Sequence, residues 1–190
     1  MCGIVGVASE EQVTDKLING LLRQEYRGYD SSGLAVFGKD SNQIQVIKRA
    51  GKVSELQNAI QEVPMRGNTG IAHTRWATHG VPTEANAHPH HSNGEVYVVH
   101  NGIIENHQEL RTTLKALGYD FESETDSEVI AHLIHAKLDD TSSLAEAVKE
   151  ALKDLEGTYG LVAIHIKEPQ VVVAARRGSP LVLGMGTGEN

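Results

Sequence analysis

The only cysteine of the chain stands at position 2, directly after the initiator methionine. Because the cysteine side chain is small, cytoplasmic aminopeptidases are expected to remove Met1 and leave Cys2 with a free α-amine. An α-amine has a pKa near ~8 and a thiol near ~8.5, so at neutral pH the amine can accept the thiol proton. Cys2 would then carry both a nucleophile and its base. The alternative is a small buried apolar side chain, which free cysteines often are.

Asn101 and Gly102 stand at the end of an apolar run, residues 96–100, that predicts a buried strand. A thiol that attacks an amide generates a tetrahedral oxyanion, which needs at least two convergent hydrogen-bond donors. Asn101 offers a side-chain NH2 group, and Gly102 lets the backbone approach closely. The pair therefore suits an oxyanion hole, and an ordinary Asn-Gly turn is the alternative.

Arg75 and Asp126 have the charges needed to bind the two ends of an amino acid. A guanidinium can grip a carboxylate through two parallel hydrogen bonds, and a carboxylate can pair with an ammonium group. Each residue also has a simpler interpretation. Arg75 would form a surface ion pair, and Asp126 would stabilise the start of a helix through its dipole. Together the two residues suit the zwitterionic end of an α-amino acid.

Three histidines within residues 88–91 raise the question of a metal site. The sequence offers them no cysteine partner and no His-Glu-x-x-His spacing, so we expect no metal and no organic cofactor. We expect these histidines to order a long loop instead. Arg27 and Asp30 lie in a charged turn that should sit near the first strand, where a structural ion pair is the simplest interpretation.

Hydrophobic periodicity predicts the elements that position these residues. Strands are expected over 3–8, 34–37, 43–48, 70–76, 96–100, 159–166, 171–175 and 181–183. Helices are expected over 13–26, 53–60 and 106–117, and from Thr125 and Ser143 onward, where a Glu three residues later completes a capping box. Hairpin-length links between strands, alternating with helix pairs, predict an α+β fold with antiparallel sheets.

The composition describes one compact domain over residues 1–190 with a sizeable core. Of its residues 39% are hydrophobic, and 17 basic against 25 acidic side chains give a net charge of −8. That charge argues against binding nucleic acid or an anionic membrane through bulk electrostatics. We also expect no membrane span and no signal peptide. A single cysteine cannot form an internal disulfide, so the cytoplasm is the expected compartment.

Five blocks of the sequence, in order, resemble a known family. They are residues 2–6 (CGIVG), 25–33 (EYRGYDSSG), 73–80 (HTRWATHG), 100–107 (HNGIIENH) and 123–126 (SETD). Together they resemble the glutaminase domains of the class II glutamine amidotransferases, and within these the glucosamine-6-phosphate synthase family. The resemblance covers essentially the whole chain. It implies the N-terminal-nucleophile hydrolase fold, a four-layer αββα arrangement with two antiparallel sheets.

The resemblance also implies a role for each matching residue, in the hydrolysis of L-glutamine to glutamate and ammonia. Cys2 would be the nucleophile with its own amine as base, and Asn101 with the Gly102 N–H would form the oxyanion hole. Asp126 would bind the substrate's α-amino group, while Trp76 would close over the substrate and gate ammonia. Arg27 would support the nucleophile from nearby. The glutamine carboxylate would be held by Arg75, Thr78 and His79.

In that family the ammonia aminates fructose 6-phosphate to give glucosamine 6-phosphate, on two sugar isomerase domains that this chain lacks. The full-length protein is then expected to be a homo-oligomer. Two alternatives remain open. The chain could be the glutaminase domain of another class II enzyme such as amidophosphoribosyltransferase, against which Trp76 and the EYRGYDSSG block argue. It could also be a glutamine-binding module without turnover.

Overall fold

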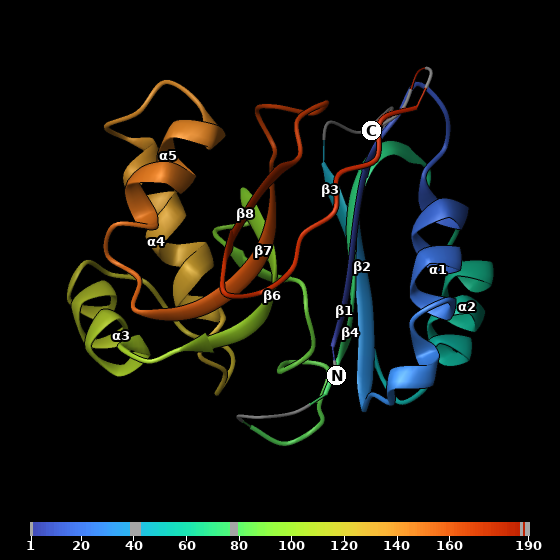
Figure 1. The fold of residues 1–190 in the computed structure, drawn as a ribbon, viewed down its shortest axis with the longest axis horizontal. Coiled ribbons are helices and arrows are strands. Elements are labelled where there is room, and N and C mark those ends of the chain that lie inside the picture. Colours follow the sequence, from blue (N-terminus) through green and yellow to red (C-terminus); the bar gives the residue numbers. More distant parts are fainter. Residues whose placement is uncertain (1, 39–42, 77–79, 187, 189–190) are drawn as a thin grey trace.

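The computed structural model describes residues 2–38, 43–76, 80–186 and 188, apart from the side chain of Arg27. Two four-stranded antiparallel sheets face each other, and helices cover the outer face of each (Figure 1). The four layers are therefore helix, sheet, sheet and helix. This arrangement confirms the α+β fold with two antiparallel sheets that the sequence predicts.

The first sheet holds the beginning of the chain and has the strand order β1-β4-β2-β3. Its strands are β1 (Gly3–Ala8), β2 (Ser31–Gly38), β3 (Ile44–Ala50) and β4 (Gly67–Arg75). The covering helices are α1 (Thr14–Leu22) and α2 (Val53–Glu62), and a 3-10 turn spans Glu25–Arg27. β1 runs antiparallel to β4, which lies inside the sheet, so the start of the chain has a fixed partner.

The second sheet has the order β5-β6-β7-β8. Its strands are β5 (His90–Ser92), β6 (Val96–Ile104), β7 (Gly157–His165) and β8 (Val173–Arg177). Its helices are α3 (His107–Ala116), α4 (Glu128–Leu138) and α5 (Leu144–Ala151). β6 pairs with β5 at its beginning and with β7 along its whole length, and Asn101 itself is paired with Gly160 of β7.

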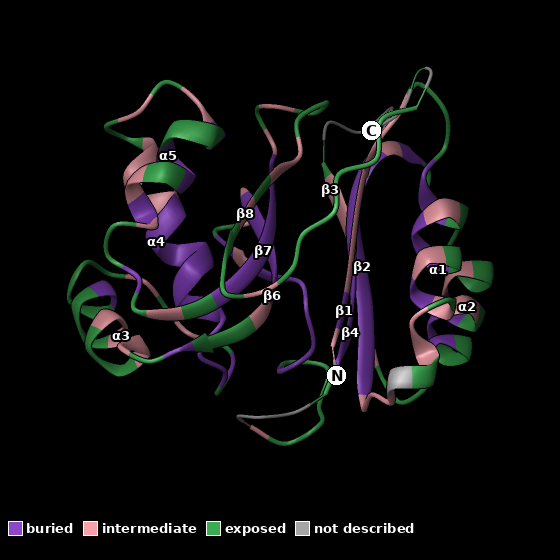
Figure 2. Cartoon of the chain, in the orientation of Figure 1, coloured by how far each residue is buried: buried purple, intermediate pink, exposed green. Residues whose placement is uncertain are grey.

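Buried apolar side chains form one cluster under each helical layer and a third between the sheets (Figure 2). The third cluster joins β2 and β4 to β6 and β7. Its members are Ala35, Ile71, Tyr97, Val99, Val162 and Ile164. Burial of this apolar surface, worth about 25 cal/mol per Å², holds the two sheets together. Their relative position therefore depends on the packing of a few side chains.

Several expectations about local structure are wrong. The helix expected from Thr125 begins instead at Glu128, because the Glu128 carboxylate accepts hydrogen bonds from Glu122 N and Ser123 N and takes no part in a capping box with Thr125. Residues 181–183 form no strand, and the sequence reasoning missed β5. The Asn-Gly alternative of a turn is also contradicted, since both residues lie within β6.

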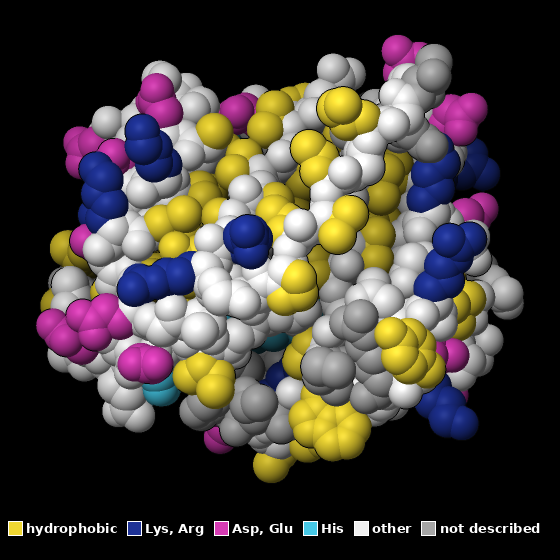
Figure 3. Space-filling view, in the orientation of Figure 1, with side chains coloured by type: hydrophobic (Ala, Val, Ile, Leu, Met, Phe, Trp, Pro, Cys, Tyr) yellow, Lys and Arg dark blue, Asp and Glu magenta, His cyan; other side chains and the backbone are white. Residues whose placement is uncertain are grey.

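The segment after β8 exposes several large apolar side chains, which are visible across the upper middle of the molecule (Figure 3). Val182, Leu183 and Met185 are the most exposed of them. Within the described part of the chain, no helix has both the length and the apolar character needed to cross a lipid bilayer.

Candidate active site

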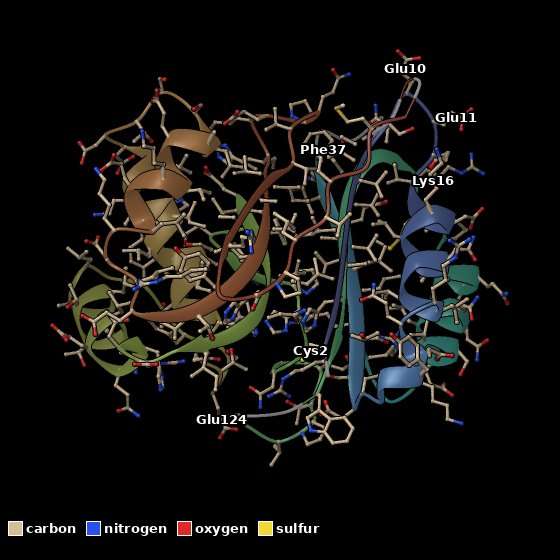
Figure 4. The ribbon with its side chains drawn as sticks, viewed as in Figure 1. Cys2, Glu10, Glu11, Lys16, Phe37 and Glu124 are labelled. Carbon is tan, nitrogen blue, oxygen red and sulfur yellow. The ribbon has the colours of Figure 1, made fainter. Side chains whose placement is uncertain are left out.

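Cys2 lies at the end of the sheet sandwich opposite to Glu10 and Phe37 (Figure 4). It directly precedes β1, whose first residue, Gly3, pairs with Thr74 of β4. The backbone N–H of Gly3 also donates to Thr74 Oγ1 at 3.1 Å. A chain terminus frays unless it is tied down, so this pairing holds the reactive residue in place.

The thiol of Cys2 is bound to the backbone of Trp76, the residue that follows β4. Trp76 N–H donates to Sγ at 3.1 Å, and the thiol lies 3.6 Å from Trp76 O. Burial raises the pKa of the Cys2 thiol, while the hydrogen bond from Trp76 N–H opposes that rise because it stabilises the thiolate. The side chain is partly buried, so the sulfur is neither on open surface nor sealed in the core.

Asn101 reaches Cys2 from the facing sheet. Its Nδ2 donates to Cys2 O at 3.3 Å, and its Oδ1 lies 2.8 Å from His73 Nε2. An amide NH2 group has two hydrogens, so the contact with Cys2 O leaves a second donor for a reacting oxygen. The structure thus brings together the predicted nucleophile and the predicted oxyanion donor, from residues 99 positions apart in the chain.

Gly102 has a backbone that only glycine adopts easily, with φ of 142°. A Cβ atom at this position would lie 2.0 Å from the carbonyl oxygen of Thr158 on β7. The strand pairing therefore excludes any side chain. Gly102 is itself exposed, so its backbone remains accessible beside Asn101.

The Arg75 side chain is only 5% exposed, which contradicts the alternative of a surface ion pair. Its guanidinium donates to Gly80 O at 3.2 Å and to Val81 O at 3.4 Å, and it lies 3.9 Å from Asp30 Oδ1. Arg75 thereby fastens the loop that follows β4. The predicted pair of Arg27 with Asp30 involves a side chain that lies outside the described part of the chain.

Trp76 is 54% exposed, and its backbone contacts Cys2. Its ring packs against Gly28, where an added Cβ would lie 2.7 Å from Trp76 Cζ3. Gly28, within the 25–33 block, therefore leaves room for this ring. Two further predicted substrate-binding residues, Thr78 and His79, lie outside the described residues.

Asp126 is buried beside the end of β6. Its Oδ2 accepts from Ile104 N at 2.8 Å, and Ser127 Oγ donates to its Oδ1 at 3.4 Å. The first contact holds the Asp126 side chain next to the strand that carries Asn101. The second is long, so Oδ1 keeps most of its capacity to accept a hydrogen bond.

The turn that carries Asp126 is held by Glu128, which is almost fully buried. Glu128 accepts from Glu122 N at 2.8 Å, from Ser123 N at 2.8 Å and from Ser123 Oγ at 2.7 Å. Burial alone raises the pKa of Glu128, but the His132 imidazole, the Ser123 hydroxyl and the two backbone N–H groups outweigh it and lower the pKa to about 2. Glu128 is therefore a carboxylate at neutral pH.

Sequence reasoning missed two buried histidines next to the site, His73 and His100. His73 contacts Asn101, and His100 Nδ1 lies 2.8 Å from Ser127 Oγ, beside Asp126. The available signal was position: His73 stands two residues before Arg75 on the same strand face, and His100 directly precedes Asn101.

The histidines of residues 88–91 are divided between two environments. His88 and His90 are buried, and His90 Nε2 lies 3.0 Å from Thr125 Oγ1. His91 lies partly exposed near Glu122, at 3.6 Å. The residues that the structure describes contain no group of three His, Cys, Asp or Glu side chains able to hold a metal ion.

Comparison with known sequences identifies close relatives. The profile of the glutamine amidotransferase domain family matches residues 73–188. A Pseudomonas putida protein named glutamine–fructose-6-phosphate aminotransferase (isomerizing) is 60% identical over 190 residues, which make up 100% of this chain and 31% of that protein. A Haemophilus influenzae protein of the same name is 58% identical over the same shares of both chains. The chain thus spans about a third of the length of these curated relatives.

Comparison with solved structures supports the same assignment of the fold. Glutamine phosphoribosylpyrophosphate amidotransferase from B. subtilis, solved with ADP and GMP, is 26% identical with a TM-score of 0.72. The match covers 87% of this chain and 35% of that chain. The four-layer αββα arrangement is therefore the N-terminal-nucleophile hydrolase fold. The chain is 60% identical to the Pseudomonas putida aminotransferase and 26% identical to this amidotransferase, so its sequence is more similar to the aminotransferases.

Proposed function

Because the chain belongs to the glutamine amidotransferase domain family, we propose that it hydrolyses the side-chain amide of L-glutamine to glutamate and ammonia through a thioester on Cys2. The observation that carries this proposal is the convergence of two donors on Cys2. Trp76 N–H lies 3.1 Å from its sulfur, and Asn101 Nδ2 lies 3.3 Å from its carbonyl oxygen. A rigid thiol beside a side-chain amide from the facing sheet is what amide hydrolysis requires.

The reaction begins once Met1 has been removed. The Cys2 amine takes the thiol proton, and Sγ forms a bond to the amide carbon while the carbonyl electrons move to oxygen. Asn101 Nδ2 and the Gly102 N–H stabilise that oxyanion. The protonated amine then gives its proton to the departing nitrogen, and the C–N bond breaks to release ammonia. A water molecule, deprotonated by the same amine, attacks the thioester, releases glutamate and restores the thiol.

Substrate binding is proposed for five residues: Arg75, Trp76, Thr78, His79 and Asp126. Asp126 binds the α-ammonium group, which its burial and its lightly used Oδ1 support. Trp76 covers the bound glutamine, and its exposure together with its backbone contact to Cys2 supports that role. Arg27 supports the nucleophile from nearby. The carboxylate of glutamine is held by Arg75, Thr78 and His79.

We further propose that the ammonia aminates fructose 6-phosphate in a longer protein. Relatives that carry this activity in their name match the whole of this chain with 31% of their own length, which leaves room for sugar isomerase domains. In this proposal the chain is one glutaminase domain of a cytoplasmic, homo-oligomeric enzyme. Its partners are L-glutamine and the isomerase domains, with no nucleic acid and no membrane.

The test compares the purified protein with its Cys2→Ala variant in glutamate and ammonia release from L-glutamine. The variant should lose turnover by about 10⁴-fold or more, since the nucleophile is gone, yet should bind glutamine in calorimetry. Intact mass must accompany each assay. Molecules that retain Met1 have an amide in place of the base and should be inactive.

Two outcomes would overturn the proposal. Ammonia release by Cys2→Ala at the parent rate would show that Cys2 is not the nucleophile. A parent protein with a free Cys2 amine that binds glutamine without releasing glutamate would be a glutamine-binding module, the alternative left open by the sequence.

A further inference from the structure

Four buried histidines on or next to the strands of the two sheets form a cluster close to the proposed site. His73 lies on β4, His90 on β5, His100 on β6, and His88 in the segment before β5. The ring centroids of His73 and His88 are 4.0 Å apart, and those of His88 and His90 are 4.5 Å apart. All four are buried, and the proposed reaction uses none of them directly. A buried polar cluster at this place calls for a function.

His73 is the member of the cluster that contacts the oxyanion donor. Its Nε2 lies 2.8 Å from Asn101 Oδ1, while Asn101 Nδ2 donates to Cys2 O at 3.3 Å. The carbonyl oxygen of Cys2 can only accept a hydrogen bond, so the amide nitrogen of Asn101 must face it. The amide oxygen is thereby turned toward His73. It follows that Nε2 of His73 carries the proton and donates to Oδ1.

The orientation of this amide decides whether the oxyanion hole works. The oxygen and nitrogen of an Asn side chain have nearly the same shape, so packing alone does not distinguish them. In the reversed orientation Oδ1 would face Cys2 O and the reacting oxygen, and two acceptors would repel a developing negative charge. The acceptor oxygen of Cys2 on one side of the amide and a donor on the opposite side together prevent that reversal.

His73 is suited to be a permanent donor. Burial lowers the pKa of His73 to about 3, so the ring stays neutral with one N–H throughout the working pH range. Among the described residues its Nδ1 has no hydrogen-bond partner of good geometry, although the His100 backbone lies near the ring. The His88 ring, which also lacks hydrogen-bond partners among the described residues, packs on His73 and fixes its plane.

We propose that His73 is a positioning residue that fixes the Asn101 amide with its nitrogen toward the reacting oxygen, through the hydrogen bond from His73 Nε2 to Asn101 Oδ1. It acts through Asn101 and touches no substrate. This inference rests on the proposed glutamine hydrolysis. The inference gives residues 73–80 a second function, in addition to the proposed binding of the substrate carboxylate by Arg75.

The test replaces His73 with Leu, which is of similar volume and cannot donate, and with Gln, whose amide nitrogen can replace Nε2 as a donor. His73→Leu should lower kcat by about 10- to 100-fold, less than the about 100- to 1,000-fold expected for loss of an oxyanion donor outright. The KM for glutamine should change by less than about threefold. His73→Gln should recover most of the loss.

A second measurement separates positioning from damage to the fold. L-glutamate γ-semialdehyde forms a tetrahedral adduct with the thiol, so its affinity reports on the oxyanion hole, whereas product glutamate tests binding without an oxyanion. His73→Leu should weaken aldehyde binding by the same factor as kcat and leave glutamate binding unchanged. The matched control is His165→Leu, because His165 is equally buried but lies at the far end of β7. It should leave kcat unchanged.

Equal kcat in His73→Leu and the parent would overturn the inference while the proposed function stands. So would an equal loss of aldehyde and glutamate affinity, or a His73→Gln variant as slow as the Leu variant, since either marks a merely structural role. Failure of the proposed function has a different signature: a parent protein with a free Cys2 amine that releases no glutamate. That result would overturn both.

Discussion

Replacement of Glu128 by Gln tests how the turn that carries Asp126 is held. The carboxylate accepts three hydrogen bonds, two from backbone N–H groups and one from the Ser123 hydroxyl. The near-isosteric amide has one acceptor oxygen and one donor nitrogen, so at least one backbone N–H then faces a donor. A hydrogen bond to a charged group is worth about 1.5–3 kcal/mol, and the remaining bonds weaken to about 1 kcal/mol each. We expect the free energy of unfolding to fall by about 3 kcal/mol at pH 7.

Proton linkage reports on the same hydrogen bonds and gives a similar magnitude. The pKa of Glu128 is lowered from its ordinary 4.5 to about 2, and each tenfold change in proton affinity corresponds to about 1.36 kcal/mol, so the carboxylate contributes about 3 kcal/mol. Because the folded-state pKa is depressed, this contribution is complete above pH 4.5 and is lost as the pH falls toward 2. The difference between parent and variant should therefore narrow over that interval.

Urea unfolding followed by far-UV circular dichroism at pH 7, 5, 4 and 3 measures this difference. The matched control is Glu146→Gln, because the Glu146 carboxylate accepts from the N–H and hydroxyl of Ser142 but is exposed. Solvent screens that site, so its substitution should have a much smaller effect. A Glu128→Gln protein within 1 kcal/mol of the parent at pH 7, or a difference that does not change with pH, would refute the reasoning.

Two further substitutions follow from the backbone geometry. Gly102→Ala places a Cβ 2.0 Å from Thr158 O at a φ of 142°, so we expect the free energy of unfolding in urea to fall by more than about 2 kcal/mol and kcat to fall by about 100-fold or more. The control, Gly184→Ala, adds a Cβ with no atom within 4 Å and should change neither quantity. A stable, active Gly102→Ala protein would contradict this expectation. Ser143→Ala removes the hydroxyl that accepts a hydrogen bond from Glu146 N at 3.3 Å. The free energy of unfolding should fall by about 1 kcal/mol, with glutamine turnover unchanged. An unaltered urea unfolding curve would show that this helix cap does not stabilise the protein.

Periodicity predicted the elements well where local contacts decide them. β1 spans the predicted residues 3–8, and the antiparallel hairpin of β2 and β3 was expected from alternation across a turn. At Ser143 the capping pattern is confirmed, because its side chain accepts from Glu146 N. The same pattern at Thr125 misled, since spacing alone does not reveal that Glu128 reaches back to Glu122 and Ser123.

The contacts of the site could not be predicted in the same way. Asn101 was expected to lie near Cys2 because oxyanion chemistry needs a donor, but its contact with His73 depends on how two sheets face each other. Asn101 and Gly102 also resemble a turn locally, and only pairing with β7 keeps them in a strand. Buried histidines such as His73 have ordinary counterparts in many cores, so residue type alone did not single this one out.

The two halves of the proposed reaction centre belong to different layers: the sulfur comes from the first sheet and the amide from the second. Their separation is therefore set by the thickness of the apolar filling between the layers, which a handful of side chains on β2, β4, β6 and β7 determine. A larger side chain there would increase the distance between the two sheets, and a smaller one would let the sheets approach each other. Turnover would thus depend on the side-chain volume of residues between the two sheets that never contact the substrate. Selection for activity would therefore also act on these core residues.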